Sequence, residues 1–499
     1  MRRAANTGSQ PPTDRSLTTH PLDDDKLHEE CGIFGIFGAN DAAALTALGL
    51  HALQHRGQEA AGIVSYDGRQ FHSHRGLGHV ADNFESEEVV SRLKGRTAIG
   101  HNRYSTTGET VLRNVQPLFA ELEFGGFAVG HNGNLTNARA LRRELVKRGC
   151  IFQSTMDSEA LIHLIATSAF ATLIDRLVDA LRQVVGAYSL VALSNSAMIG
   201  VRDPMGVRPL VLGELDGAPI LASETCALDI IGAQFIRDVE PGEIVVCSED
   251  GVESLKPFPP QKHRPCIFEY IYFSRPDSII EEMSVYDIRK NIGRELSRES
   301  GVPADLVIPI PDSGTPAALG YANEAGIPFE LGIIRNHYVG RTFIEPTQQI
   351  RDLGVKLKHN ANRSEIAGRR VILVDDSIVR GTTARKIVQM VRDAGATEVH
   401  MRIASPPTMH PCFYGIDTPS REELLAARMN VEDMRDHIGV DTLAYISIDG
   451  LYRAARENRR NADDPQFCDA CFTGDYPVAL TDLADGDPPA QLSLLAESA

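Results

Sequence analysis

The spacing of apolar residues changes along the chain. From residue 31 to about 255, short apolar runs alternate with turns and predict a series of strands, interrupted by helical spacing over 137–149 and 158–184. After residue 265, strand-like runs alternate with helical segments, which is typical of a parallel sheet. We therefore predict two α/β domains in sequence.

Three segments fall outside this pattern. Residues 1–30 are polar and lack periodicity, so we predict a disordered leader or propeptide. The proline-rich, basic stretch at 255–265 predicts a linker, which places the first domain at 31–262 and the second at 263–475. The acidic C-terminal tail at 476–499 is expected to end in disorder.

One predicted strand ends in two acidic residues. The apolar run 371–374 indicates a buried parallel strand, and Asp375 and Asp376 follow at its carboxyl end. The turn at 377–383 leads into a helix, so its backbone N–H groups suit a phosphate, while the carboxylates suit ribose hydroxyls or Mg²⁺. An ordinary strand-turn-helix is the alternative, although two buried carboxylates are costly without partners.

This stretch, VILVDDSIVRGTT, resembles the phosphoribosylpyrophosphate (PRPP) signature of type I phosphoribosyltransferases. The resemblance implies that Asp375 and Asp376 bind the ribose diol and Mg²⁺. It also implies that the 5′-phosphate is held by Ser377, Arg380, Gly381, Thr382 and Thr383.

A second turn, in ADLVIPIPDSGTPAALGYA at 304–322, also follows a predicted strand. Its small residues allow the backbone to approach a pyrophosphate, although a plain turn is the ordinary alternative. The turn is similar to the pyrophosphate loop of the same family. The resemblance places Asp312 and Ser313 near the diphosphate and makes Ser313 a further oxygen ligand for Mg²⁺.

Cys31 opens the first predicted strand. A cysteine at such a position is commonly buried and structural. If residues 1–30 were removed, its α-amine, with an ordinary pKa of about 7.7–8.0, could act as base for its own thiol. On this residue alone, both interpretations stay open.

Four motifs favour the second interpretation: LQHRGQEAAGI at 53–63, GHNRYSTTG at 100–108, GHNGNLTN at 130–137 and STMDSEAL at 154–161. Together with Cys31 they resemble the glutaminase domain of the N-terminal-nucleophile (Ntn) amidotransferases, which implies an αββα sandwich.

The resemblance assigns a role to each motif. Cys31 would be nucleophile and base, with Asn132 and the N–H of Gly133 as oxyanion hole, and glutamine would be bound by Arg56, Arg103 and Asp157. The chemistry agrees, because an oxyanion needs N–H donors and free glutamine needs a cation and an anion. Singly, these residues have ordinary alternatives: a turn, a surface ion pair or a helix cap.

The segment 335–358 is basic and has few consistent apolar positions. Beside an anion site it predicts a lid that closes on PRPP, with a basic surface loop as the alternative. It resembles the corresponding loop of the glutamine PRPP amidotransferase family, which implies PRPP binding by Arg341 and an ammonia route lined by Tyr338 and Ile344.

Four cysteines form a separate set: Cys266, Cys412, Cys468 and Cys471. The C-x-x-C formed by the last two suits a redox pair, zinc or an iron–sulfur cluster, and four thiolates do not separate zinc from a cluster. One branch of the glutamine PRPP amidotransferases holds a [4Fe-4S] cluster on this arrangement, and the resemblance implies one structural cluster per subunit. Cys150, Cys226 and Cys247 have no partner motif.

Composition and charge further limit the kinds of protein that the chain could be. The 499 residues carry 50 basic and 67 acidic side chains, a formal charge of −17, which argues against a nucleic-acid binder. No apolar run approaches the ~18–20 residues of a membrane span, and the first residues lack a signal-peptide core. Eight scattered cysteines fit a reducing compartment, so we expect a cytoplasmic protein with neither nucleic acid nor membrane as partner.

The resemblance to the glutamine PRPP amidotransferase family covers about residues 31–475. It implies hydrolysis of glutamine and transfer of ammonia to C1 of PRPP, which opens purine biosynthesis, with one Mg²⁺ per subunit. It also implies a homotetramer, inhibition by purine nucleotides and autocatalytic loss of the leader.

Two other functions are alternatives to this expectation. A regulatory PRPP-binding protein would have no reason to keep the glutaminase residues. A glutaminase joined to a sugar-phosphate isomerase or an asparagine synthetase half would not need the DDSIVRGTT turn.

Overall fold

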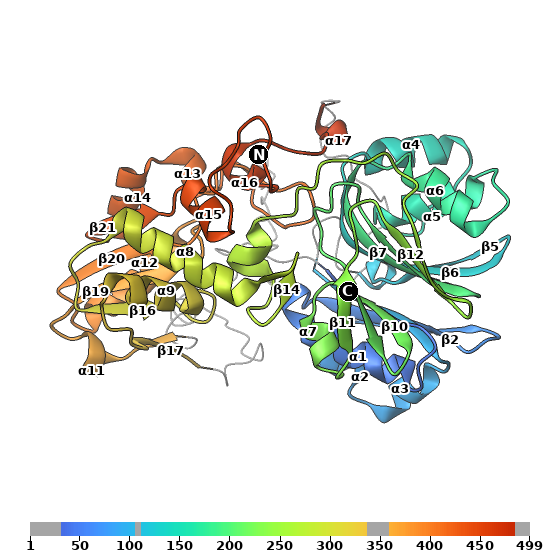
Figure 1. The fold of residues 1–499 in the computed structure, drawn as a ribbon, viewed down its shortest axis with the longest axis horizontal. Coiled ribbons are helices and arrows are strands. Elements are labelled where there is room, and N and C mark those ends of the chain that lie inside the picture. Colours follow the sequence, from blue (N-terminus) through green and yellow to red (C-terminus); the bar gives the residue numbers. More distant parts are fainter. Residues whose placement is uncertain (1–30, 105–110, 337–358, 485–499) are drawn as a thin grey trace, which may run out of the picture.

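The computed structural model describes residues 31–104, 111–336 and 359–484 (Figure 1). Its first half stacks two antiparallel sheets face to face, with helices on both outer sides, and the second half is built on a parallel sheet. The predicted fold class, an αββα sandwich followed by a parallel-sheet domain, is confirmed.

The first sheet of the sandwich has seven strands in the order β11-β9-β10-β1-β4-β2-β3. Their bounds are β1 (Gly32–Ile36), β2 (Ala60–Tyr66), β3 (Phe71–Leu77), β4 (Thr97–Arg103), β9 (Val211–Leu215), β10 (Ala218–Ala222) and β11 (Gln234–Asp238). The second sheet has six strands in the order β13-β12-β8-β7-β6-β5. Their bounds are β5 (Leu118–Leu122), β6 (Gly125–Leu135), β7 (Gly186–Ser194), β8 (Ala197–Arg202), β12 (Ile244–Ser248) and β13 (Gly251–Leu255).

Apolar side chains from both sheets meet between them, among them Ile33, Ile99, Val191 and Met198. Separate clusters lie under the outer helices. The seven-stranded sheet is covered by α1 (Ala42–Ala52), α2 (Val80–Phe84), α3 (Glu87–Arg92) and α7 (Cys226–Asp229). The six-stranded sheet is covered by α4 (Ala138–Lys147), α5 (Ser158–Thr167) and α6 (Leu173–Leu181).

The predicted helical segment 158–184 is two helices, α5 and α6. Ser168 ends α5 in an extended conformation, and the hydroxyl of Thr172 accepts a hydrogen bond from the backbone N–H of Asp175 at 3.1 Å. This N-cap starts a new helix, because it satisfies a backbone donor that a continuous helix would use internally. The helical pattern predicted over 158–184 therefore comprises two helices with a non-helical stretch between them.

The parallel sheet has the order β16-β19-β20-β21. Its strands are β16 (Leu306–Pro309), β19 (Arg370–Asp375), β20 (Glu398–Ile403) and β21 (Thr442–Tyr445). Along β19, Val371 and Leu373 face one apolar cluster while Ile372 and Val374 face another. The run is continuously apolar because both faces of the sheet are covered. The covering helices are α8 (Val285–Ser300), α9 (Thr315–Ala325), α15 (Ile448–Ala454), α11 (Arg363–Ile366), α12 (Thr382–Asp393), α13 (Leu425–Arg428) and α14 (Val431–Ile438).

Shorter elements complete the described chain. They are the turns η2 (Gln54–Arg56), η3 (Leu112–Asn114) and η4 (Glu269–Phe273), the hairpins β14 (Ile279–Ile280) with β15 (Met283–Ser284) and β17 (Ile333–Arg335) with β18 (His359–Ala361), and α16 (Ala470–Thr473) and α17 (Thr481–Ala484).

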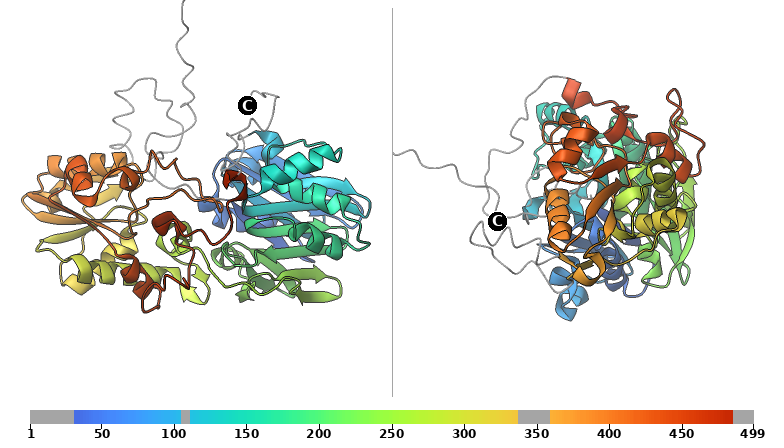
Figure 2. Two further views of the ribbon diagram at one scale, coloured as in Figure 1. Left: turned by 90° about the horizontal axis from the view of Figure 1, so that it is seen from above. Right: turned by 90° about the vertical axis from the view of Figure 1, so that its left-hand side faces the viewer.

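The chain has no helix or strand between β13 and η4, where the linker was predicted, and the boundary at 262/263 stays a prediction. After the parallel sheet the C-terminal segment returns between the two halves (Figure 2). There Thr136 donates a hydrogen bond to the carbonyl of Ala479, and Asp482 accepts one from the N–H of Arg139 at the start of α4. In the part of the chain that the structure describes, no helix is long and apolar enough to cross a membrane.

Two candidate active sites

Cys31 lies at the start of β1, in the middle of the seven-stranded sheet. The pairing of Gly32 with Asn102 sets Cys31 beside the carboxyl end of β4, and its thiol donates to the carbonyl of Tyr104 at 3.9 Å. Arg103 ends β4 and is buried. Burial lowers the pKa of Arg103, against the charges of Cys31, Glu59 and Asp157, which raise it. The structure therefore brings Cys31, Arg103 and Asp157 together.

Asn132 and Gly133 lie on β6, in the facing sheet. The side chain of Asn132 is fully buried, and neither its Oδ1 nor its Nδ2 has a hydrogen-bond partner in the described chain. An amide buried without partners costs free energy, so this one is prepared for a ligand. Gly133 has a φ of 137°, and a Cβ there would lie 2.1 Å from the carbonyl oxygen of Ala187, so only glycine fits.

Asp157 caps α5 and also connects it to β6. Its Oδ1 accepts a hydrogen bond from the N–H of Ser158 at 2.7 Å, and its Oδ2 accepts one from the N–H of Leu135 at 2.9 Å. Burial would raise its pKa, but His131, 3.5 Å from Oδ1, and these hydrogen bonds hold the pKa below its ordinary value. The helix-cap alternative is therefore real, and the capping carboxylate also stays charged near Arg103.

A cavity of about 230 Å³ adjoins Asp157 on the side of α4. It is lined by Met156, Arg139 and Arg142 of the first half and closed by Phe413 and Leu480 from the second. Met156 also accepts a hydrogen bond from Nη1 of Arg103 at 2.8 Å, so this side chain stands between the cavity and Arg103.

Arg56 lies at the junction of the two halves. Its guanidinium is fully buried and pairs with Glu224 and with Glu269, the latter at 2.5 Å from Nη2. Ser274 accepts a further hydrogen bond at 3.1 Å. The role in closing the glutamine pocket that the resemblance implies for Arg56 stays a prediction.

The second site lies at the carboxyl ends of two adjacent parallel strands. The chain after β16 carries Ser313, and β19 ends at Asp375, which Asp376 follows; both carboxylates are buried. Ser313 donates to Oδ2 of Asp376, Ser377 donates to its Oδ1 at 2.6 Å, and Oδ1 of Asp375 accepts from the N–H of Asp376 at 3.0 Å. The three predicted Mg²⁺ ligands are thus neighbours at the edge where ligands of parallel sheets bind.

The turn after β19 positions the start of α12. Gly381 is its N-cap, with a φ of 81°, and Thr382 and Thr383 form the first turn, whose N–H groups can bind an anion. Nη2 of Arg380 lies 3.4 Å from Oε2 of Glu423. On the other loop, Asp312 is exposed and pairs with Arg335 of β17.

Comparisons with known proteins agree with both sites. Residues 101–229 match a model of the glutamine amidotransferase domain, and residues 279–404 match one of the phosphoribosyl transferase domain. An amidophosphoribosyltransferase from Rhizobium etli is 60% identical over 487 residues, covering 96% of this chain and 98% of that one. The Bacillus subtilis amidophosphoribosyltransferase is 49% identical, covering 91% and 95%.

A solved structure extends the likeness to three dimensions. The glutamine PRPP amidotransferase of Bacillus subtilis, described as complexed with ADP and GMP, aligns with a TM-score of 0.86 at 48% identity over 90% of this chain and 98% of that one. The chain belongs to the amidophosphoribosyltransferase family. The family membership predicted from the sequence is confirmed. A regulatory PRPP-binding protein and a glutaminase joined to another acceptor domain are therefore set aside.

The four cysteines singled out in the sequence come together from distant segments. Cys266 and Cys468 form an isolated β-bridge, and the carbonyl of Cys471 accepts hydrogen bonds from the N–H groups of Met409 and His410, near Cys412. Burial raises the pKa of Cys471 well above its ordinary value, and the other three cysteines raise it further. None of the four is joined in a disulfide bond.

This donor set fits a metal or an iron–sulfur cluster, because four cysteines from three segments lie near one another and two of them, Cys266 and Cys468, are buried. The described residues do not, however, contain a group of three or more His, Cys, Asp or Glu side chains already arranged to hold a metal ion.

Two other cysteines lie apart from this set. Burial raises the pKa of Cys226, and that of Cys247 to about 12. Both lie within the sandwich, as expected of structural cysteines.

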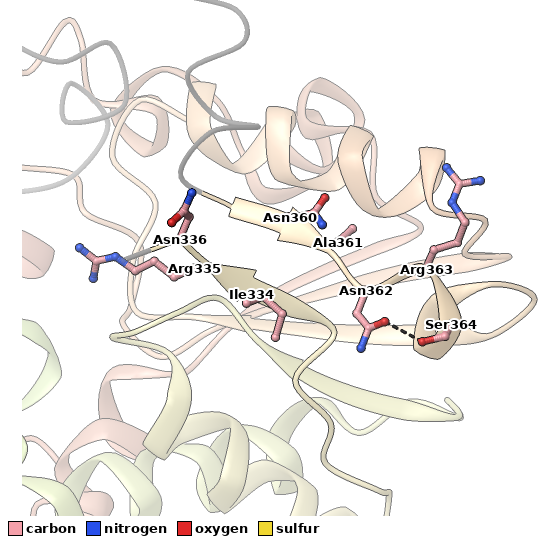
Figure 3. A pocket seen from close by; sticks show the side chains of 8 residues that line it. All are labelled: Ile334, Arg335, Asn336, Asn360, Ala361, Asn362, Arg363 and Ser364. Atoms are coloured by element: carbon pink, nitrogen blue, oxygen red, sulfur yellow. Dashed lines mark hydrogen bonds between the residues drawn. The ribbon is translucent and has the colours of Figure 1, made fainter. Parts of the chain in front are cut away.

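A cavity of about 690 Å³ lies along the β17–β18 hairpin of this family member (Figure 3). Arg335 and Arg363 stand at its two ends with the asparagines 336, 360 and 362 between them, and Ser364 donates to Asn362 at 2.7 Å. The residues Arg341, Tyr338 and Ile344, for which the sequence predicts roles, lie outside the described residues, as does the leader 1–30. No quoted motif includes Glu269, because its partners Arg56 and Arg208 are distant in the chain.

Proposed function

We propose that the chain converts glutamine, PRPP and water into 5-phospho-β-D-ribosylamine, glutamate and pyrophosphate, the first committed step of purine biosynthesis. One observation carries the proposal: a buried constellation around Cys31 and the acidic pair Asp375 and Asp376 at a sheet edge occur in one chain. A PRPP-binding regulator would not need the first, and another glutaminase would not need the second.

Glutamine hydrolysis takes place at Cys31 once residues 1–30 have been removed. The α-amine accepts the thiol proton, and the thiolate attacks the side-chain amide carbon, while Asn132 and the N–H of Gly133 stabilise the oxyanion. The α-amine then returns the proton as ammonia leaves, and water hydrolyses the thioester to glutamate and the free thiol. Arg103 and Asp157 orient glutamine through its α-carboxylate and α-amine.

The phosphoribosyl site receives the ammonia. Asp375 and Asp376 bind the ribose hydroxyls, the loop 377–383 binds the 5′-phosphate, and Asp312 with Ser313 lies near the diphosphate. Ammonia travels inside the protein and attacks C1, the C1–O bond to pyrophosphate breaks, and a proton is released. Ser313, Asp375 and Asp376 would hold the Mg²⁺, which supplies charge neutralisation for the leaving diphosphate. Arg341 is assigned to PRPP and Tyr338 with Ile344 to the ammonia route.

The four cysteines Cys266, Cys412, Cys468 and Cys471 are proposed to hold one structural [4Fe-4S] cluster per subunit. Their burial and proximity support the proposal, and nothing in amide transfer requires an electron carrier. Metal analysis tests it: about four irons per chain support the cluster, and stoichiometric zinc refutes it.

Assembly and regulation follow the family in this proposal. We infer a cytoplasmic homotetramer that purine nucleotides inhibit. Only the nucleotide part has support from a relative, because the Bacillus subtilis protein was solved in complex with ADP and GMP. Sedimentation and inhibition assays with ADP and GMP test these two points.

PRPP-dependent glutamate release is the experiment that tests both sites together. The wild-type protein should release glutamate from glutamine in the presence of PRPP, and Cys31→Ala should abolish the release. Cys31→Ala should still form phosphoribosylamine from ammonia and PRPP. N-terminal sequencing of active protein should begin at Cys31, and a retained leader in a glutamine-active sample would refute the mechanism.

A further inference from the structure

A buried network of ion pairs joins the two halves of the molecule. Arg56 on η2 pairs with Glu224 and Glu269, and Arg208 pairs with Glu269 at 3.1 Å. The four side chains are at most 2% exposed. Glu224 precedes α7 in the first half, whereas Glu269 begins η4 in the second. Figure 1 shows this junction where β14 lies beside α7, and the N–H of Ile279 donates to Thr225 there at 2.9 Å.

The network has several contacts for each carboxylate. Two guanidinium groups face two carboxylates, His55 also contacts Glu224 at 2.6 Å, and Ser274 donates to Glu269 at 2.5 Å. Burial would raise the pKa of Glu269, but Arg56 and Arg208 hold it below its ordinary value. The Glu269 carboxylate therefore stays ionised, and Arg56 binds it with a planar, directional group.

Glu269 is anchored to the second half by its own segment. Arg289 of α8 donates from Nε to the carbonyl of Tyr270 at 2.9 Å and from Nη2 to that of Tyr272 at 2.7 Å. Arg56 thus pairs with a segment whose position is set by the phosphoribosyltransferase half.

The residues on either side of Arg56 contact the glutaminase site. A Cβ on Gly32, which follows Cys31, would lie 2.9 Å from Cβ of Leu53, so the turn before Arg56 packs directly on β1. A Cβ on Gly57 would lie 2.8 Å from the backbone of Arg103. A displacement of η2 therefore shifts both the nucleophile strand and the end of β4.

We propose that Glu269 is a positioning residue for glutamine hydrolysis. It acts through Arg56, which holds η2 against the strands that carry Cys31 and Arg103, and it does not touch glutamine. The proposal rests on the proposed function and goes beyond it, because it makes the glutaminase site depend on a carboxylate of the other half.

The test compares two activities of the full-length Glu269→Gln protein. Phosphoribosylamine formation from ammonia and PRPP bypasses the glutaminase site and reports on folding of the second half. Because small misplacements of reacting groups are costly, kcat/KM for glutamine should fall by about 10- to 100-fold. The ammonia-dependent rate should stay within about twofold of wild type, since its site is not displaced.

Glu281→Gln is the matched control. Glu281 also forms an ion pair across the junction, with the buried Arg202 at 2.6 Å, although its own side chain is 20% exposed, and no contact joins it to η2 in the described chain. Glu281→Gln should leave the ratio of the glutamine-dependent activity to the ammonia-dependent activity unchanged. Arg56→Lys keeps the charge and removes the fork that binds both carboxylates, so it should lower the glutamine-dependent activity selectively.

Three outcomes would overturn the proposal: an unchanged kcat/KM for glutamine in Glu269→Gln, an equal loss of both activities, or the same selective loss in Glu281→Gln. A wild-type protein that releases no glutamate in the presence of PRPP would instead refute the proposed function itself.

Discussion

At the scale of single residues, Asn132 differs most from an ordinary core position. Its amide is fully buried, and neither polar atom has a partner in the described residues. Such a group costs about 1–3 kcal/mol unless a ligand satisfies it. Asn132 lies in the six-stranded sheet, which faces the sheet that carries Cys31. A role of its Nδ2 in binding a ligand there explains why the protein keeps an amide that costs stability.

Asn132→Ala should lower kcat for glutamine by about 10²- to 10³-fold, because an oxyanion donor is lost. The ammonia-dependent rate should not change, since the phosphoribosyl site lies in the other half. Steady-state kinetics with both nitrogen donors measures this. Asn195→Ala is the control, because Asn195 caps Gly126 at the far end of β6. Equal losses with glutamine and ammonia would contradict the assignment.

His101 gives the protein a predictable response to acid. Burial, with the charge of Arg103, lowers its pKa to about 3, and its Nδ1 has no hydrogen-bond partner in the described chain. Between pH ~6.5 and ~3 the unfolded state binds the extra proton, so stability is complete above pH ~6.5 and falls by about 1.4 kcal/mol per pH unit below it.

His101→Gln should remove this component of the pH dependence. Urea unfolding at several pH values below ~6.5 should therefore give a shallower decline for the variant than for wild type. His51→Gln, at an exposed position on α1, should keep the wild-type slope. Identical slopes for the two variants would show that His101 is not kept neutral by burial.

At the scale of elements, the sequence predicted best where local chemistry decides. The run before Asp375 became β19, and the helix after Gly381 became α12. The segment 158–184 is helical in two parts, because a short cap at Thr172 interrupts an otherwise continuous helical pattern. The ion pairs of Arg56 were not predicted, because its partners, Glu224 and Glu269, are 168 and 213 residues away.

The turn between β19 and α12 requires glycine at 381. Its φ is 81°, and a Cβ would lie 2.6 Å from Cδ2 of Leu425. Gly381→Ala should therefore cost about 1–3 kcal/mol for backbone strain, with an added steric cost, and should weaken PRPP binding. Thermal melts and the KM for PRPP measure the two effects.

Gly368→Ala is the matched control for this turn. Gly368 has a similar φ of 76° but nothing within 4 Å of the added Cβ, so only the backbone strain remains. The difference in stability between the two variants isolates the contact with Leu425. An unchanged KM for PRPP in Gly381→Ala would argue against phosphate binding at this turn.

At the scale of the whole molecule, the sequence predicted both halves but not how they are joined. Motifs are local in sequence, and each half carries its own. The junction depends on pairs such as Arg208 with Glu269 and on Asn134, which donates to the carbonyl of Phe413 at 2.9 Å from 279 residues away. No periodicity or motif connects such partners, so only the folded chain identifies them.

The cysteine set gives the prediction at this scale, because it joins three segments of the second half. A cluster on Cys266, Cys412, Cys468 and Cys471 would cross-link the start of this half to its C-terminal segment. Cys471→Ser should therefore lower the iron content and the melting temperature together. Removing the group that closes such long loops costs roughly 2–5 kcal/mol, by analogy with disulfides.

Cys247→Ser is the control for this experiment, because Cys247 is a buried free thiol inside the sandwich. It should leave the iron content unchanged, whatever its effect on packing. Because Asp482 and Ala479 contact α4 and Thr136 of the glutaminase half, loss of the cross-link should also loosen this C-terminal contact. Hydrogen exchange at the start of α4 should accordingly rise in Cys471→Ser and not in Cys247→Ser. Equal exchange at the start of α4 in both variants would show that the cysteine site does not stabilise the contact between the C-terminal segment and the glutaminase half.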